Sequence, residues 1–518
     1  MQKPCMSLQN PQRNDIKRII NALSRQAVEL QSQRTLLIRV IQDDPSYVEE
    51  ILRVPHGVQY LLDSDPARYH HTEAVTNLIH RVQRIEASLA RIKEKTTELL
   101  LLIPPIASLP EEILALIFQA GSLAEHKSGL PFPMLIASVS RTWRKIALST
   151  STLWTNVYTP LYRPRHWLPI ALERSATQPL DITLDFRTGL APSSEAVVAC
   201  MAAVSAHMYR WRRFTLITHH RNVVLLIGEL LASAQSLSLQ HLRLSLTGSG
   251  PAGNQEVSIP RLFAGGAPEL HSVRLDSVVL PWRSPPLVGL TMLDIRWLWF
   301  RKLMYSQFQD LLAASPNLTT LTLRGKHIDL RPGGSYTPIY LPNLRYLEVS
   351  GDKVCLLCAL LVPPALETLT LANVDEGEFR EFMSWLPYSG ARYSALKSLV
   401  LLNVATCPLS REFIAAFSTI TQLTIINSGA ERFLELLRSK QTFDPRMPVT
   451  LNWPGLKNVT MLDDTSYDKV YGMVAERAAH CLPLHRLIVH TEFIHRYLMT
   501  PLAQFVKIDS VTSLDREP

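Results

Sequence analysis

The chain contains 518 residues, of which 47% are hydrophobic and 19% charged, and its formal net charge is +8. One hydrophobic core rarely serves so many residues, so the length predicts several units or a repeat array. The low share of charged residues argues against a largely disordered chain. A charge of +8 spread over this length does not by itself indicate nucleic-acid binding.

Six cysteines are too few for a secreted scaffold built on disulfides. The N-terminus, MQKPCMSLQNPQRND, lacks the apolar segment of a signal peptide. The longest aliphatic runs, 99–103 and 356–362, are shorter than the roughly 18–20 residues that a membrane helix needs. We therefore expect a soluble protein of the cytoplasm and/or nucleus that binds no membrane.

Residues 10–103 are expected to form two helices. In the first, apolar residues recur at steps of three and four, namely Ile16, Ile19, Ile20, Leu23, Ala27 and Leu30. In the second, the residues on one face alternate by four and three, namely Val75, Leu78, Val82, Ile85, Leu89, Ile92, Thr96 and Leu99. This heptad spacing predicts either a helical hairpin within one chain or a coiled coil between chains, with self-association through residues 75–99.

The prolines at 104 and 105 end the second helix, and a third helix is expected over LPEEILALIF, residues 109–118. Ser108 and Glu111 have the spacing of a capping box, and Pro110 suits a first helical turn. This helix has more apolar residues than a small core can cover, which predicts a docking surface. Two further helical stretches are expected at 134–139 and 141–148.

LPEEILALIF, VSRTWRKIALST and TLW, in this order and spacing, resemble the F-box, a small three-helix domain, over residues 104–157. The segment around Trp167, Leu172 and Pro179 is similar to the one that follows the F-box in many fungal, mushroom-type F-box proteins. The family often has Cys where Ser140 stands. The resemblance implies a substrate receptor of an SCF-type, cullin-based ubiquitin ligase, without catalytic activity or cofactor of its own.

The same resemblance implies the partners, which are a Skp-type adaptor, the cullin ligase core and a target protein that the sequence does not identify. It places eight residues in the adaptor contact or directly under it: Leu109, Pro110, Ile113, Leu114, Ile117, Phe118, Val139 and Trp143. For Ile117 and Trp143, a place in the domain's own core is an equal alternative.

The rest of the sequence is repetitive. Eleven segments have the pattern apolar-x-x-apolar-x-apolar, and they begin at Trp211, Leu239, Leu270, Leu290, Leu318, Leu344, Leu366, Leu396, Ile420, Leu456 and Leu484. From Leu239 to Leu484 the mean step is about 27 residues, within the roughly 20–29 of leucine-rich repeats. Each segment predicts a short strand, and apolar stretches such as 194–209 and 413–417 predict return helices. Asn373 and Asn403 lie one residue short of the usual Asn position, so we expect irregular repeats.

The expected fold is α/β: a helical hairpin or coiled coil over 10–103, an F-box over 104–157, a linker with a first repeat-like unit over 158–210, a leucine-rich-repeat solenoid over 211–500 and a C-terminal tail over 501–518. Outward strand residues of a solenoid line a concave surface that suits a target protein. The candidates are Arg274, Thr322, Arg345, Glu348, Thr370 and Lys397. The alternative function is a leucine-rich-repeat scaffold without a ligase, in which the F-box helices cap the first repeat.

Motifs for other chemistry find little support. Residues 248–253 match the dinucleotide fingerprint, but Pro251 and Pro260 leave no room for the helix it requires, which favours an inter-repeat loop. Cys355 and Cys358 have metal or redox spacing without a second pair, so we expect two buried thiols on a return helix.

Two further patterns concern metal and nucleic-acid binding. The histidines at 70, 71 and 80 and at 485, 490 and 495 lack the paired spacing of a zinc site, so no metal is expected. Trp211 falls on the first apolar position of a repeat. We therefore expect it to pack inward, with Arg210, Arg212 and Arg213 facing solvent, rather than to form a nucleic-acid stripe.

Overall fold

The computed structural model describes most of the chain. The described residues are 10–42, 73–101, 106, 109–123, 131–160, 167–187, 191–248, 256–281, 287–298, 303–325, 328–330, 336–351, 353–389, 392–405, 411–438, 440–441, 450–463, 465–497 and 499–511. The chain divides into two compact units, Met1–Gly121 and Ser122–Pro518, which are described separately.

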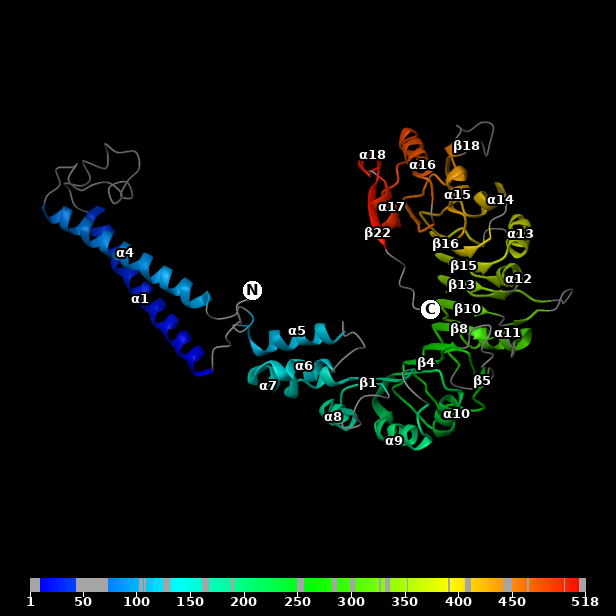
Figure 1. Cartoon of the computed structure of the whole chain (residues 1–518), viewed down its shortest axis with the longest axis horizontal. Helices are drawn as coiled ribbons and strands as arrows, with labels where there is room; N and C mark the ends of the chain where they lie inside the picture. Colours follow the sequence, from blue (N-terminus) through cyan, green and yellow to red (C-terminus); the bar gives the residue numbers. More distant parts are fainter. Residues whose placement is uncertain are drawn as a thin grey trace. The chain divides into compact units, whose positions relative to one another are not determined.

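The first unit contains a long helical hairpin formed by α1 (Asn10–Gln42) and α4 (Glu73–Leu101), which pack along each other (Figure 1). The covered residues of α1 follow heptad steps, namely Ile16, Ile20, Leu23, Ala27, Leu30, Arg34, Leu37 and Ile41. On α4, Ile79 and Val82 are buried, and Glu86 pairs with Arg34 at 2.7 Å. Each helix therefore covers the heptad seam of the other. Ile19 is 47% exposed and lies outside the seam, although its spacing placed it there.

Three short helices follow. α5 (Glu111–Leu123) begins directly after Pro110, as expected from the capping pattern, while Ser108 lies outside the described residues. α6 (Phe132–Val139) and α7 (Arg141–Ser149) belong to the second unit. Ser140 separates them and caps α7, because its hydroxyl accepts a hydrogen bond from the amide of Trp143 at 3.1 Å.

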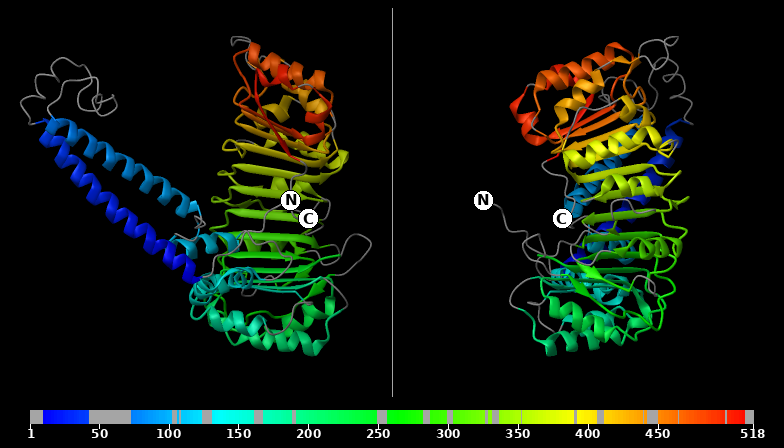
Figure 2. Two further views of the ribbon diagram at one scale, coloured as in Figure 1. Left: turned by 60° about the vertical axis from the view of Figure 1, so that its left-hand side comes forward. Right: turned by 90° about the vertical axis from the view of Figure 1, so that its right-hand side faces the viewer.

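The second unit is built on one sheet of 14 strands, in which every pairing is parallel and the strand order follows the chain (Figure 2). The strands are β1 (Asn156–Pro160), β2 (Leu180–Phe186), β3 (Trp211–Thr218), β4 (His241–Leu246), β6 (Ser272–Asp276), β8 (Met292–Leu298), β10 (Thr320–Gly325), β13 (Tyr346–Ser350), β15 (Thr368–Val374), β16 (Ser398–Val404), β17 (Gln422–Ile426), β20 (Asn458–Met461), β21 (Arg486–His490) and β22 (Lys507–Val511). This order is compatible with a solenoid, because each strand pairs with the next one along the chain.

Most connections between strands run through helices that cover one face of the sheet, whereas the described residues between β4 and β6, β6 and β8, and β10 and β13 contain no helix (Figure 1). These helices are α8 (Trp167–Arg174), α9 (Ser194–Ser205), α10 (Arg221–Leu230), α11 (Tyr305–Ala313), α12 (Val354–Leu360), α13 (Glu376–Trp385), α14 (Arg411–Ala416), α15 (Ala430–Arg438), α16 (Tyr467–Ala479), α17 (Thr491–Arg496) and α18 (Thr500–Ala503), with the 3-10 turns η3 (Ser151–Trp154), η4 (Met208–Arg210) and η5 (Leu386–Tyr388). Among the described residues no helix is both long and apolar enough to cross a membrane.

Four two-stranded pairs complete the strands of this unit. Three are parallel: β5 (Val257–Ser258) with β7 (Val278–Val279), β9 (Leu303–Met304) with β11 (Ile328–Asp329), and β12 (Ile339–Tyr340) with β14 (Leu361–Val362). The fourth, β18 (Lys440–Gln441) with β19 (Thr450–Leu451), is antiparallel.

The eleven apolar segments each coincide with a strand of the large sheet, so the predicted strands are confirmed. Their second and third apolar residues, such as Leu321 and Leu323, point to the helix-covered side and are fully buried. The return helices expected within 194–209 and 413–417 correspond to α9 and α14. Alternation at a period of two is what brings these leucines to one face.

In several units a residue of positive φ lies two positions after the last apolar residue of the strand pattern, where it interrupts or ends the regular strand. The residues are Ser277, Gly325, Gly351, Asn373, Asn403 and Asn427. The three asparagines form a ladder, with each Nδ2 donating to the unit before: Asn373 to Ser350 Oγ at 3.2 Å, Asn403 to Asn373 Oδ1 at 3.0 Å, and Asn427 to Asn403 Oδ1 at 3.0 Å. Asparagine suits this place because it tolerates the left-handed conformation and its amide satisfies a neighbouring polar group.

The sheet extends beyond the limits expected from the sequence at both ends. β1 begins at the expected end of the F-box, and β2 lies within 158–210, where we expected a linker with a first repeat-like unit. The registers of both strands run directly into β3. β22 lies within the expected C-terminal tail and pairs with β21. Neither end has the full apolar pattern that marks the inner units, so spacing alone could not place them.

Candidate functional site

The first candidate surface is the exposed side of α5. Ile113, Leu116 and Ile117 are 43%, 59% and 44% exposed, while Leu114 and Phe118 are 3% and 2% exposed. Leu109 is half-buried and Pro110 is exposed at the start of the helix. Of the residues assigned to the adaptor contact, Ile113 and Ile117 therefore offer surface to a partner, and Leu114 and Phe118 can only support it from beneath.

The second candidate surface lies on α6 and α7. Met134, Leu135 and Val139 are 37%, 44% and 60% exposed, whereas Ile136 is buried. Trp143 is half-buried, so part of its ring is open to a partner. Exposed aliphatic side chains on consecutive turns of a short helix are a feature of interaction surfaces rather than of a monomer's core.

Both surfaces lie within a segment that matches a known family. Residues 106–160 match the F-box-like family model. This match includes the Leu-Pro start, the three helices, η3 and the first strand of the sheet. A search of curated proteins found no match. F-box domains in general bind Skp-type adaptors of cullin ligases, and this shared property is the basis for the proposal below.

The F-box-like region is joined to the sheet through buried tryptophans. Trp154 is 2% exposed, donates from Nε1 to the carbonyl oxygen of Ala147 at 2.7 Å, and lies 5.9 Å from Trp167, centroid to centroid. Trp167 on α8 donates to the carbonyl oxygen of Tyr158 in β1 at 3.2 Å. These contacts connect α7, η3 and β1 to the body of the second unit.

The third candidate site is the sheet face opposite the helices. Of its six predicted residues, Arg274, Thr322, Glu348 and Thr370 occupy one register position in β6, β10, β13 and β15. Thr322, Glu348 and Thr370 are at most 4% exposed. Their neighbours on the face cover them, which an alternating pattern could not reveal, so Thr370 offers no surface to a target.

Arg345 and Lys397 lie one residue before β13 and β16, at the edge of the face, and both are exposed. Each pairs with Glu367, at 3.8 Å and 3.4 Å. Exposed pairs of this kind contribute little to stability, so these side chains are available for exchange with a partner.

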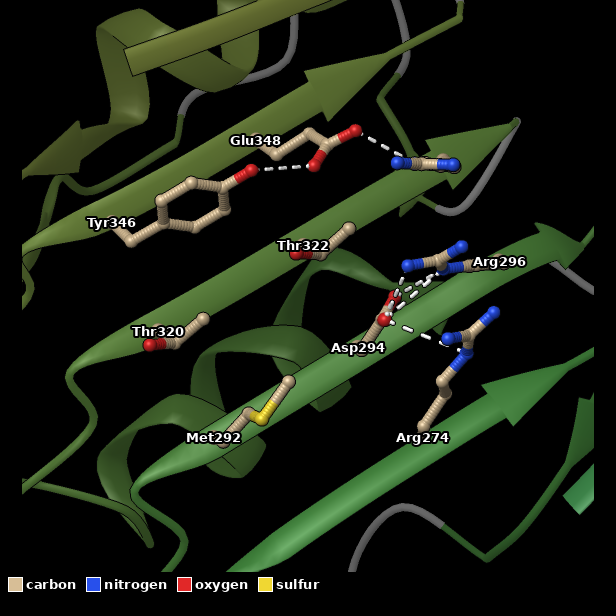
Figure 3. A pocket seen from close by; sticks show the side chains of 9 residues that line it. Arg274, Met292, Asp294, Arg296, Thr320, Thr322, Tyr346 and Glu348 are labelled. Atoms are coloured by element: carbon tan, nitrogen blue, oxygen red, sulfur yellow. Dashed lines mark hydrogen bonds and ion pairs between the residues drawn. The ribbon is translucent and has the colours of Figure 1, made fainter. Parts of the chain in front are cut away.

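Charged residues gather in the middle of the face around a hollow of about 550 Å³ (Figure 3). It is lined by Arg274, Met292, Asp294, Arg296, Thr320, Thr322, Arg324, Tyr346 and Glu348. Arg274 and Arg296 both approach Asp294, with nitrogen–oxygen distances of 3.7 Å and 2.8 Å. The carboxylate of Glu348 accepts hydrogen bonds from Arg324 Nε at 2.7 Å and from the Tyr346 hydroxyl at 2.8 Å.

The two central arginines differ in their electrostatic environment. Burial lowers the pKa of Arg274, and Arg296 and Arg243 lower it further against the opposing effect of Asp276 and Asp294. Burial also acts on Arg296, but hydrogen bonds to Asp294 outweigh it and raise the pKa of Arg296. Carboxylates therefore compensate Arg296 more fully than Arg274, although Arg274 also pairs with Asp276 at 3.3 Å.

Sequence reasoning identified Arg274, Thr322 and Glu348 but missed Asp294, Arg296 and Arg324, which complete the hollow. Their positions in the strands could have identified them. Asp294 pairs in register with Arg274 and Thr322, and Arg296 and Arg324 each lie two residues further along the same face. Reading all outward positions together, rather than strand by strand, would have grouped them.

The remaining cysteine, glycine and histidine motifs form no recognisable site in the described residues. Cys355 and Cys358 are buried on α12, as expected, and burial raises the pKa of Cys355 to about 12, which leaves it a neutral thiol. Gly248 ends a strand unit, and β5 follows where the dinucleotide motif requires a helix, although 249–255 lie outside the described residues. Within the described part of the chain, no three His, Cys, Asp or Glu residues are placed to hold a metal ion. His70 and His71 lie outside it.

Trp211 is fully buried and stacks on Phe214 at 4.8 Å, which confirms that it packs inward. Arg212 and Arg213 are exposed as expected. The expectation for Arg210 was wrong: it is 5% exposed and donates to Ser175 Oγ at 2.9 Å and to the carbonyl of Leu172 at 2.8 Å. It acts as a buried support between α8 and β3.

Proposed function

We propose that the chain is the substrate-receptor subunit of an SCF-type cullin ubiquitin ligase. The observation that carries the proposal is the F-box-like match over 106–160 together with the exposed apolar side chains of α5 within it. A surface of Ile113, Leu116 and Ile117 is costly to leave in water, and a Skp-type adaptor would cover it.

In this proposal the parallel sheet is an irregular leucine-rich-repeat solenoid that captures the target protein on its open face. The chain supplies no catalytic group. It raises the local concentration of the target beside the enzyme that transfers ubiquitin, through the adaptor and the cullin ligase core. The eleven strand-forming repeats and the asparagine ladder support this assignment.

Co-purification of the full-length protein with a recombinant Skp-type adaptor tests the proposal. We expect near-stoichiometric capture by the wild type and its loss in the Leu109→Ala/Pro110→Ala variant, with the helical circular dichroism of both proteins alike. Failure of a correctly folded wild type to bind the adaptor would favour the scaffold function, in which the F-box-like helices only cap the solenoid.

A further inference from the structure

The charge around the central hollow does not balance. Three arginines line it, Arg274, Arg296 and Arg324, against the carboxylates of Asp294 and Glu348. Beside the hollow, Asp276 pairs with Arg274 at 3.3 Å and with Arg296 at 3.8 Å, and Arg243 repels Arg274. This cluster of four arginines and three carboxylates therefore has a net charge of +1. A single additional carboxylate would neutralise it, whereas a doubly charged phosphate would reverse its sign.

The excess positive charge resides on groups with unused hydrogen-bond donors. In the described part of the chain, Nη2 of Arg274 and Nη1 of Arg296 have no hydrogen-bond partner, although both atoms are covered. Arg296 as a whole is only 8% exposed. Buried guanidinium donors without a partner destabilise the charged group, and a ligand that accepts hydrogen bonds from them removes this penalty. The side chain of Arg274 retains 18% exposure, more than the 10% of Arg296 and the 15% of Arg324, so it is the most accessible of the three arginines.

The chemistry of the face changes beyond β13. The register position of Arg296 and Arg324 continues through Ser350 and Ala372 to Leu402 and Ile426. Leu402 and Ile426 are half-buried. A charged zone and an aliphatic zone thus lie on one row of the same sheet.

We propose that this row binds an extended, unmodified segment of a partner protein, with one Asp or Glu carboxylate at Arg274 and Arg296 and an aliphatic side chain over Leu402. Charge complementarity fixes the first contact and apolar burial the second. That the segment belongs to a protein to be ubiquitinated rests on the proposed function; the binding itself does not.

The structure also sets the spacing of the two anchors. Four strand steps separate Arg296 in β8 from Leu402 in β16. At about 4.8 Å per step the separation is about 19 Å, which an extended peptide spans in about six residues. We therefore expect the acidic and the aliphatic residue of the segment to lie five to seven positions apart.

Selection from a phage-displayed library of random 12-residue peptides on the immobilised full-length protein tests the proposal. We expect enriched peptides to share one acidic residue and one aliphatic residue at this spacing. An enriched peptide is then synthesised with Glu, Gln or phosphoserine at the acidic position, and its affinity is measured by fluorescence anisotropy. The Glu peptide should bind at least tenfold more tightly than the Gln peptide and no less tightly than the phosphoserine peptide.

Protein variants assign the effect to the hollow. Arg274→Met should weaken the Glu peptide at least tenfold and abolish the difference between Glu and Gln. Arg486→Met changes an exposed arginine in β21 of the same sheet and should leave both affinities unchanged. Thermal melting confirms that both variants fold.

Several results would overturn the proposal: no enriched peptide, enrichment without an acidic residue, or a Glu preference that survives in folded Arg274→Met. Tighter binding of phosphoserine would replace the single-carboxylate site by a phosphopeptide site. Adaptor capture depends on α5 and α6, which these variants leave unchanged. A chain that binds the peptide but not the adaptor therefore refutes the ligase function alone, and the converse refutes the hollow alone.

Discussion

The apolar surface of α5 allows the adaptor contact to be tested quantitatively. Ile113, Leu116 and Ile117 together leave about one and a half side chains exposed, from fractions of 43%, 59% and 44%. Full burial of an Ile or Leu side chain stabilises by about 1.5–3 kcal/mol, so covering these exposed parts contributes about 3 kcal/mol to binding. The triple substitution to Ser should thus weaken adaptor binding roughly a hundredfold.

The assay is isothermal titration of the full-length protein with a Skp-type adaptor. The matched control is a triple Ser variant of Leu230, Leu237 and Val288, which are 42%, 54% and 54% exposed and lie outside the F-box-like match. The control should keep wild-type affinity. Equal weakening by the two triple variants, or no weakening by the α5 variant, would refute the assignment of this surface.

Three further predictions concern stability and assembly. Asp185→Asn should cost about 2–3 kcal/mol at neutral pH, because the buried carboxylate loses charge-assisted bonds to an arginine and a tyrosine. Although burial opposes the ionised form, those bonds hold the pKa of Asp185 below its ordinary value of 3.8. In thermal melts the loss of stability in Asp185→Asn should therefore persist above pH 3.8 and shrink as the pH falls through the lower pKa of the folded state. Gly351→Ala should lower the melting temperature far more than Gly266→Ala: both have φ near +100°, but only at Gly351 would a Cβ lie 2.7 Å from a backbone oxygen. Val82→Asp should reduce the helical circular dichroism without changing the molar mass in light scattering, because it buries a charge in the helical hairpin. Val28→Asp, at a 64% exposed position, should change neither quantity. A halved molar mass for Val82→Asp would instead indicate a dimer.

The sequence was most informative where one physical rule acted alone. Every inner strand was predicted, because burying one face of a strand requires an apolar residue at alternate positions, as in Leu321 and Leu323. The heptads of α1 and α4 were equally readable, but spacing could not tell an intramolecular seam from an intermolecular one. In the structure α4 packs against α1 of the same chain, and Val82 on α4 is fully buried.

The open face of the sheet was harder to predict, since outward residues obey no single rule. Glu348 was predicted as a target contact, yet it is 3% exposed, with its carboxylate paired to Arg324 and hydrogen-bonded by the hydroxyl of Tyr346. Pairing of this kind depends on the register between strands, which cannot be derived from the sequence alone. Arg210 was misplaced for a similar reason: its guanidinium reaches carbonyl groups more than 30 residues away.

The junction at Trp154 connects the two halves of the proposed function. Because β1 is both the end of the F-box-like match and the first strand of the sheet, no flexible linker separates α7 from the sheet. The buried indole of Trp154 holds α7 through Ala147, and Trp167 holds β1 through Tyr158. Any target segment bound on the sheet face would therefore lie at a fixed position relative to α6 and α7. Such a rigid connection raises the effective concentration of the target near a transferring enzyme, because a flexible connection would distribute the target over a larger volume.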